Sequence, residues 1–357
     1  MVFLFCLLTA FTMQAQTFEK SKQISRSFAL GNDSEVEVSN KYGNINIVPW
    51  EKDSVKFQIN LSVKGSKQSK VDKTFGLIDF EFESTPYYII VKTDFQGNSF
   101  WNDVSDIGSS VFGSNTKTKI DYTIYLPATA KLKIINKYGN IYAADHKGDL
   151  SVNLSNGDLK AHDLMGNVSI TTEFGNCDVK QIKTGTLNIS YGELYLDKSH
   201  NLTLTGKSST FHMGIAGVIN INSKRDKIFI NSADVIKGTF YFSRLEPDSI
   251  NEVLDCSAKY GDINIKKLGD DCRFFKLKTN ATDVVLHFTD QKQYNLSILT
   301  NKETKVYYSS SIKNINSKNI DRDDKMINVE CVIGNNNRQN IPLSIECIGG
   351  SLSLSKK

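Results

Sequence analysis

The chain has 357 residues, of which 39% are hydrophobic and 23% are charged, with 43 Lys and Arg against 39 Asp and Glu. This composition suits one elongated domain or two ordinary domains with a buried core, and it excludes disordered and collagen-like chains. A formal net charge of +4 over this length argues against nucleic acid as a partner, because phosphate binding needs a concentrated basic face.

The first segment, Met1 to Ala15, is uncharged and contains a run of apolar residues from Val2 to Leu8. An apolar stretch of about 7–15 residues that ends in small and polar residues predicts a secretory signal peptide, cleaved here after Ala15. No later segment approaches the roughly 18 uncharged apolar residues of a membrane-spanning helix. We therefore expect an exported protein, located in the periplasm, on the outer-membrane surface or outside the cell.

Three further regions follow the signal peptide. Residues 16–65 are expected to form the first strands or coils, residues 66–120 an insertion, and residues 121–357 the main repetitive part. Within the insertion, Ser66 to Leu77 has apolar residues at helical spacing and predicts a short helix.

The insertion continues with a loop rich in Gly, Ser and Asn, from Asp94 to Lys119, which also carries large apolar side chains. In a secreted protein such a loop forms a contact surface or covers the open end of a repeat structure, and we favour the capping role. If the chain has a contact site, we expect its first residues to be Phe100, Trp101 and Phe112.

The strongest signal is a repeat of Gly, then Asn or Asp, then an apolar residue. It recurs at a constant step of nine, at Gly139, Gly148, Gly157, Gly166 and Gly175, and becomes less regular afterwards. Apolar and polar residues alternate between the glycines, which predicts strands with one buried face, and Gly with Asn or Asp predicts positive-φ turns. Nine residues suit one strand and one corner, so two units predict a coil of about eighteen residues in an all-β, single-stranded β-solenoid.

Polar residues of the repeat fall into two columns in such a coil. Asn140, Asp158 and Asn176 stack on one edge, and Asp149 and Asn167 stack on the other. We expect these side chains to satisfy backbone groups at the corners, which is a structural role that needs no ligand.

The residue before the glycine is often aromatic, at Tyr42, Tyr138, Phe174, Tyr191 and Tyr260. Stacking of the rings along one edge explains this pattern, and we favour it over a sugar-binding strip. Tyr138 and Tyr191 are nevertheless our second choice, after the loop residues, for side chains that contact a partner.

Five cysteines remain after the signal peptide, so at least one thiol is free or pairs between chains. Cys331 and Cys347 lie in near-identical segments sixteen residues apart, each in the apolar phase of its segment. Parallel stacking of these segments about 4.8 Å apart would place the two Cα atoms within disulfide range. Buried free thiols are the alternative, and the one that we favour.

The order of these features is a signal peptide, the motif Lys41 to Ile47, an insertion, Ile124 to Pro127, the motif Asn136 to Ile141, and Gly–Asp/Asn coils. This order resembles the secreted adhesin-like β-solenoid proteins of Bacteroidota, described as adhesins or as domains of unknown function. The resemblance implies adhesion and brings no catalytic residues with it.

Motifs for enzyme chemistry are incomplete. Gly206-Lys207-Ser208 is similar to the end of a phosphate-binding loop, but Asn201 stands where that loop requires glycine. The five His residues lack metal-binding spacing, and one Gly per step with frequent Asn lacks the loop geometry and charge of a calcium β-roll. Asp149 and Asp158 fall on opposite edges, so they cannot form a close carboxylate pair. We predict neither enzymatic activity nor a cofactor or metal.

The sequence therefore predicts a non-catalytic surface or envelope protein whose rigid, repetitive β face binds a partner, either a glycan or a cell-surface protein. A periplasmic structural or envelope-stress component would have the same features and stays open. A β-helix polysaccharide lyase or hydrolase is the second alternative.

Overall fold

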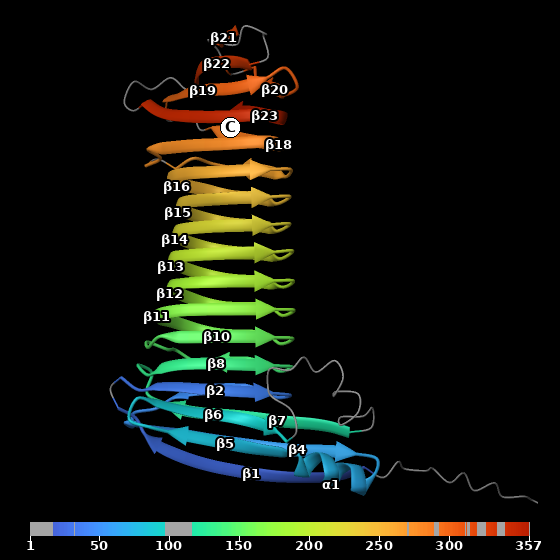
Figure 1. Cartoon of the computed structure of the whole chain (residues 1–357). Coiled ribbons are helices and arrows are strands. Elements are labelled where there is room, and N and C mark those ends of the chain that lie inside the picture. The colour runs from blue at the N-terminus through green and yellow to red at the C-terminus, as the bar shows by residue number, and fades with distance from the viewer. Residues whose placement is uncertain are drawn as a thin grey trace, which may run out of the picture.

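The computed structural model of the chain describes residues 17–31, 33–96, 116–269, 271–288, 293–310, 312, 315–319, 326–333 and 340–356. The predicted signal peptide and the loop residues Phe100, Trp101 and Phe112 lie outside the described residues. Within them the chain is mostly β-strand with one short helix, and the strands form one long, largely parallel hydrogen-bonded sheet. Its strands are stacked one above another along the length of the molecule (Figure 1).

The N-terminal end of the stack combines antiparallel strands with the helix. Its elements are β1 (Phe18–Ala29), β2 (Glu35–Lys41), β3 (Ile45–Pro49), β4 (Ser54–Gly65), α1 (Gln68–Gly76), β5 (Ile78–Ser84), β6 (Tyr88–Phe95) and β7 (Thr116–Leu126). β1 and β7 pair antiparallel with β4, and β5 pairs antiparallel with β6. α1 buries Val71 and confirms the predicted short helix, and its nine residues are too few to cross a membrane.

The middle of the stack is parallel. Its strands are β8 (Lys131–Lys137), β9 (Ile141–Ala143), β10 (Leu150–Ser155), β11 (Leu159–Glu173), β12 (Cys177–Ser190), β13 (Glu193–Lys207), β14 (Thr210–Lys224), β15 (Lys227–Tyr241), β16 (Arg244–Lys259), β17 (Asp262–Ile265) and β18 (Phe274–Phe288). Leu150 pairs with Val168, eighteen residues on, whereas Val168 pairs with Gly185, seventeen residues on. The change accompanies a register shift between Leu164 and Asn167. At this point β12 has one residue fewer than β11, between Ile182 and Thr184. This shorter coil explains why the nine-residue glycine step ends at Gly175.

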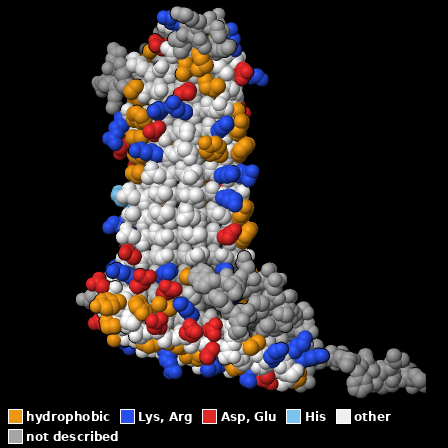
Figure 2. Space-filling view, in the orientation of Figure 1, with side chains coloured by type: hydrophobic (Ala, Val, Ile, Leu, Met, Phe, Trp, Pro, Cys, Tyr) orange, Lys and Arg blue, Asp and Glu red, His pale blue; other side chains and the backbone are white. Residues whose placement is uncertain are grey.

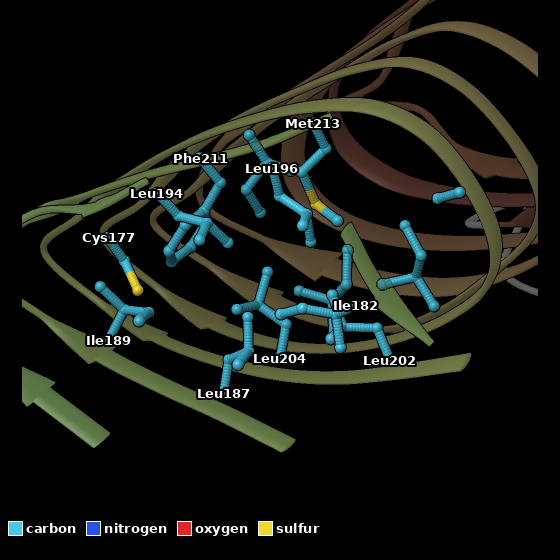
Figure 3. Packing of buried hydrophobic residues seen from close by; sticks show 14 of the residues in the cluster. Cys177, Ile182, Leu187, Ile189, Leu194, Leu196, Leu202, Leu204, Phe211 and Met213 are labelled. Carbon is cyan, nitrogen blue, oxygen red and sulfur yellow. The ribbon is translucent and has the colours of Figure 1, made fainter. Parts of the chain in front are cut away.

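The core lies inside the stack, where inward side chains of successive strands form apolar columns. Cys177, Leu194 and Phe211 occupy one register position on β12, β13 and β14, and all three are 0% exposed. Figure 3 shows them packed toward Leu187 and Leu204 from the opposite side of the stack. Because the strands alternate one buried and one outward residue, each step adds apolar area to a continuous core, at about 25 cal/mol per Å² removed from water.

The corners differ from the prediction in which residue takes positive φ. On the edge of Gly139, Gly157 and Gly175, the left-handed residue is the one before the glycine, as in Asn156 with φ 57°, and these glycines themselves are not left-handed. Gly157 is required for another reason: a Cβ there would lie 2.2 Å from the carbonyl oxygen of Gly139 in the preceding corner. The glycine column therefore permits the close approach of successive corners.

The C-terminal end returns to antiparallel pairing. Its strands are β19 (Gln293–Asn301), β20 (Lys305–Tyr308), β21 (Asn316–Asn319), β22 (Met326–Ile333) and β23 (Asn340–Lys356). β23 pairs in parallel with β18 and β19, whereas β22 pairs antiparallel with β19 and β21.

This end of the sheet contains the two cysteines for which the sequence left a disulfide open and favoured free thiols. Cys331 and Cys347 are both free and buried. β19 lies between their strands, and Cys331 pairs with Leu296 of β19 whereas Cys347 pairs with Thr300. The two near-identical segments are therefore not stacked directly on each other, which is why no bond forms.

Candidate functional site

The most regular surface of the molecule lies on the outward side of β10 to β14. Two adjacent outward positions on each of these strands carry an uncharged polar side chain. We call these ten residues the polar face: Ser151, Asn153, Ser169, Thr171, Thr186, Asn188, Thr203, Thr205, Asn220 and Asn222. Figure 2 shows this surface as a broad region without charged or hydrophobic side chains, bounded by both kinds along its edges.

The register of the strands fixes the spacing of the polar face. Ser169 pairs with Thr186 and Thr186 pairs with Thr203, so each column runs along the stack. Neighbouring rows are about 4.8 Å apart, and the two columns are about 6.6 Å apart along each strand. The result is a grid of hydroxyl and amide groups.

Few of these groups bond within the protein. Among the described residues, the side-chain hydrogen bonds of the polar face are Asn188 Nδ2 to Thr171 Oγ1 at 3.4 Å and Thr239 Oγ1 to Asn222 Oδ1 at 3.2 Å. A hollow of about 390 Å³ opens beside the grid over β11 to β14, lined partly by Thr186, Thr203 and Asn220. The remaining hydroxyl and amide groups are free to bond water or a partner.

Asn and Asp ladders hold the corners in register, as predicted. Asp158 N–H donates to Asn140 Oδ1 at 2.9 Å, and Asn176 N–H donates to Asp158 Oδ1 at 2.9 Å. On the other edge, Asn167 N–H donates to Asp149 Oδ1 at 3.0 Å. These bonds confirm the structural role, and they place Asp149 and Asp158 in different ladders, so the two carboxylates form no catalytic pair.

Aromatic rings stack in pairs along the corner beside the polar face, which confirms the predicted edge. Ring centroids are 5.4 Å apart for Tyr42 and Tyr138, and 5.0 Å apart for Phe174 and Tyr191. Of the predicted contact residues, Tyr138 is 51% exposed and Tyr191 is 40% exposed. They belong to separate pairs, with the corner of Asn156 between the pairs, so the structure does not bring them together.

Sequence reasoning missed other members of these columns. Phe242 stacks on Tyr260 at 5.0 Å, although Ser243 rather than Gly follows it. A second stack runs across β13, β14 and β15 and contains Tyr195, His212 and Phe229. The ring centroids are 4.9 Å apart for the first two and 5.2 Å apart for the last two. A search at the seventeen-residue step would have found both, because their members are seventeen or eighteen residues apart.

Titratable groups do not gather into a reactive centre in the described part of the chain. No group of three or more His, Cys, Asp and Glu side chains there could hold a metal ion. His146 is buried, and burial lowers its pKa. A larger hollow, about 640 Å³, crosses β18, β23, β19 and β22, with Phe274 and Val332 at its rim and Lys276 and Glu330 among its charged lining.

Comparison with known proteins gives similarity to solved structures alone. No family model and no curated protein matches the chain. A "putative adhesin" from Bacteroides fragilis is 12% identical with a TM-score of 0.28, and a "putative adhesin" from Parabacteroides distasonis is 13% identical with a TM-score of 0.34; each match covers 74% of this chain and 97% of the other. A "putative lipid binding protein" from Parabacteroides distasonis is 10% identical with a TM-score of 0.32, and covers 94% of this chain and 96% of the other. The label of the family that the sequence resembles is thus also the label of two similar structures.

Proposed function

We propose that the protein is an exported, non-catalytic binding module, an adhesin in the broad sense, which presents its repetitive β face to a neutral, hydroxyl-rich polymer. The observation that carries this proposal is the polar face: ten outward Ser, Thr and Asn residues on five consecutive strands, in a chain with 23% charged residues. Solvated surfaces normally carry about 25–35% charged side chains. The fold does not require their absence, since other outward positions of the same strands carry Lys and Glu.

A neutral polysaccharide has the chemistry that such a grid would recognise. Its hydroxyl groups donate and accept hydrogen bonds, and it carries no charge that Lys or Glu side chains would pair. Each contact is weak, but contacts repeated on a rigid support add their free energies without a deep pocket. The ladders of Asn and Asp side chains supply that rigidity by holding each corner on the next.

The proposed architecture is a single-stranded β-solenoid over residues 121–357, with the first coils at 16–65 and an insertion at 66–120. Three observations support it: pairing at seventeen or eighteen residues, columns of glycine at the corners, and the continuous stack of strands (Figure 1). Phe100, Trp101 and Phe112 stay predicted contact residues. Their replacement by Ser tests them, because loss of binding with an unchanged melting temperature separates contact from capping.

The binding proposal is tested by sedimentation with insoluble neutral polysaccharides such as cellulose, chitin and β-1,3-glucan. Thr186→Lys places a charge in the middle of the polar face, and Gln181→Lys places the same charge on the other half of the same strand, β12. We expect Thr186→Lys to weaken binding about tenfold or more, because it interrupts repeated contacts, and Gln181→Lys to leave it unchanged. Failure of the unaltered protein to bind any of these polymers, or equal binding by the two variants, would contradict the proposal.

Location is tested by protease treatment of intact and lysed cells, followed by detection of this protein. Digestion on intact cells supports a surface adhesin. Digestion only after lysis places the protein inside the outer membrane and favours an envelope component instead.

A further inference from the structure

Five cations gather on consecutive corners in the middle of the stack. They are Lys207, Lys224, Arg225, Lys227 and Arg244, all exposed, and we call them the basic corner. Lys207 pairs in register with Lys224 at the end of one strand segment, and Lys227 pairs in register with Arg244 at the start of the next. Parallel neighbours are about 4.8 Å apart, so like charges lie side by side along the edge of the polar face.

Carboxylates compensate little of this charge. Arg244 forms an ion pair with Glu246, but among the described residues the other four cations have no carboxylate partner. The acid at this corner, Asp226, is only 2% exposed. Its carboxylate accepts hydrogen bonds from the Ser223 hydroxyl at 2.7 Å and from the backbone N–H groups of Ser209 and Lys224, at 2.8 and 3.0 Å, and therefore points into the corner.

The fold does not need cations at these positions. The three residues directly before Lys207 in its column are Ser155, Glu173 and Ser190, which are neutral or acidic, whereas Lys137 and Lys41 occupy the same column further toward the N-terminal end. Like charges that lie opposite each other in a sheet are destabilising. Elsewhere on the stack a neighbouring acid offsets an exposed Lys, as Asp248 does for Lys266 at 2.5 Å.

Aromatic pairs border the basic corner on both sides. Phe174 and Tyr191 stack just before it, and Phe242 and Tyr260 stack at its far end. Lys207 Nζ lies 5.1 Å from the centre of the Tyr191 ring, which joins the cations to the first pair. In Figure 2, blue side chains lie between two orange groups along one edge of the uncharged surface. From the corner of Tyr191 to that of Phe242 there are three steps, roughly 14 Å.

We propose that the basic corner binds an anionic polysaccharide, a sugar chain with carboxylate or sulfate groups, lying along the stack. Lys and Arg form charge-assisted hydrogen bonds with such anions, and the exposed edges of the stacked rings offer apolar contact to the sugar rings at either end. This inference goes beyond the proposed function, because the site, the ligand charge and the residues differ from those of the polar face.

Two other polyanions fit less well. A membrane of anionic lipid needs a broad basic face, whereas these cations form a strip one corner wide beside an uncharged surface. Single-stranded nucleic acid needs open ring faces for its bases. Here the rings within each pair cover one another, and Lys207 lies over the outer face of Tyr191.

The test measures binding of the full chain to dextran sulfate and to polygalacturonate, with neutral dextran, a single-stranded oligonucleotide and anionic phospholipid vesicles as comparison probes. The variant Lys224→Gln/Arg225→Gln removes two cations without ion-pair partners. The control Lys160→Gln/Lys183→Gln removes two exposed cations elsewhere and changes the net charge equally. We expect the first variant to weaken binding of the anionic polysaccharides about tenfold or more, with a reduced salt dependence, and the control to bind as the unaltered chain does.

A second variant separates the rings from the charges. Phe242→Asn keeps a side chain that tolerates the left-handed corner, as Asn156 does at φ 57°. It should weaken binding of the polysaccharides but not of inorganic polyphosphate. No binding of either anionic polysaccharide, an equal loss in the control, or equal or tighter binding of the oligonucleotide or vesicles would overturn the proposal. Failure of the neutral-polymer assay leaves this test unaffected, because it uses other residues and probes.

Discussion

Replacing Gly157 by Ala places a methyl carbon 2.2 Å from the carbonyl oxygen of Gly139 and 2.8 Å from its carbonyl carbon. Real Cβ atoms do not approach another heavy atom within 3.0 Å, so the two corners must separate by at least 3.0 − 2.2 = 0.8 Å. This movement stretches the bonds on either side, from Tyr138 N–H to Ser155 O at 3.0 Å and from Asp158 N–H to Asn140 Oδ1 at 2.9 Å.

The expected cost follows from these contacts. Loss of two hydrogen bonds contributes about 1–3 kcal/mol, and the strain of overpacking adds about 1–3 kcal/mol. We therefore expect Gly157→Ala to lower the free energy of unfolding by about 2–6 kcal/mol. In a chain of this length each kcal/mol lowers the melting temperature by about 1–2 °C.

Thermal and urea unfolding followed by circular dichroism measure this loss. The neighbouring variant Asn156→Gly is the control, since position 156 has the positive φ; it should change stability by less than about 1 kcal/mol, because Asn already tolerates this conformation. If the melting temperature of Gly157→Ala lies within about 1 °C of that of the unaltered chain, the close-approach explanation for the glycine column is refuted.

Three further predictions concern the ladder, the buried acid and the thiols. Asn140→Ala removes the acceptor for Asp158 N–H and should lower the free energy of unfolding in urea by about 1–2 kcal/mol. Asn153→Ala, on the open polar face, should lower it by less than about 0.5 kcal/mol. Equal losses in the two variants would contradict the role of the ladder. Burial raises the pKa of Asp226, so between its ordinary and raised pKa the folded state binds more protons than the unfolded state, and stability from this group falls as pH rises through that window. Asp226→Asn should flatten this part of the pH profile of unfolding, and an unchanged slope would argue against it. Burial raises the pKa of the Cys177 thiol to about 12, so it should not react with a disulfide reagent at about pH 8 until the chain unfolds; prompt labelling of the native protein would disprove this.

Local patterns predicted a large part of the structure. Alternation of apolar and polar residues gives the strands, since a strand turns successive side chains to opposite faces. The constant step from Gly139 to Gly175 gives the two corner columns, and Asn140 with Asp158 gives one ladder. Each of these signals lies within a few residues of sequence or repeats at a fixed distance.

The rest depends on register that the sequence does not display. One residue is lost after Ile182, and the columns of Ser, Thr and Asn become visible only once the pairing is known. The basic corner was hidden for the same reason, because Lys207 and Arg225 are eighteen residues apart in sequence and adjacent only in the stack. At Asp226 and Ser243 a polar side chain replaces the glycine and supplies hydrogen bonds of its own, so the motif disappears although the corner persists.

The step between paired strands also governs how this molecule can change length. In the described part of the chain β13 pairs with β12 and β14, so a segment from one corner to the next of its column touches only its immediate neighbours. Duplication of such a segment of seventeen or eighteen residues would lengthen the stack by about 4.8 Å and leave both antiparallel ends as they are. An insertion that breaks the alternation would instead turn Thr186 and its column inward. Reach along the stack can therefore evolve in discrete increments, independently of the surface chemistry at each level.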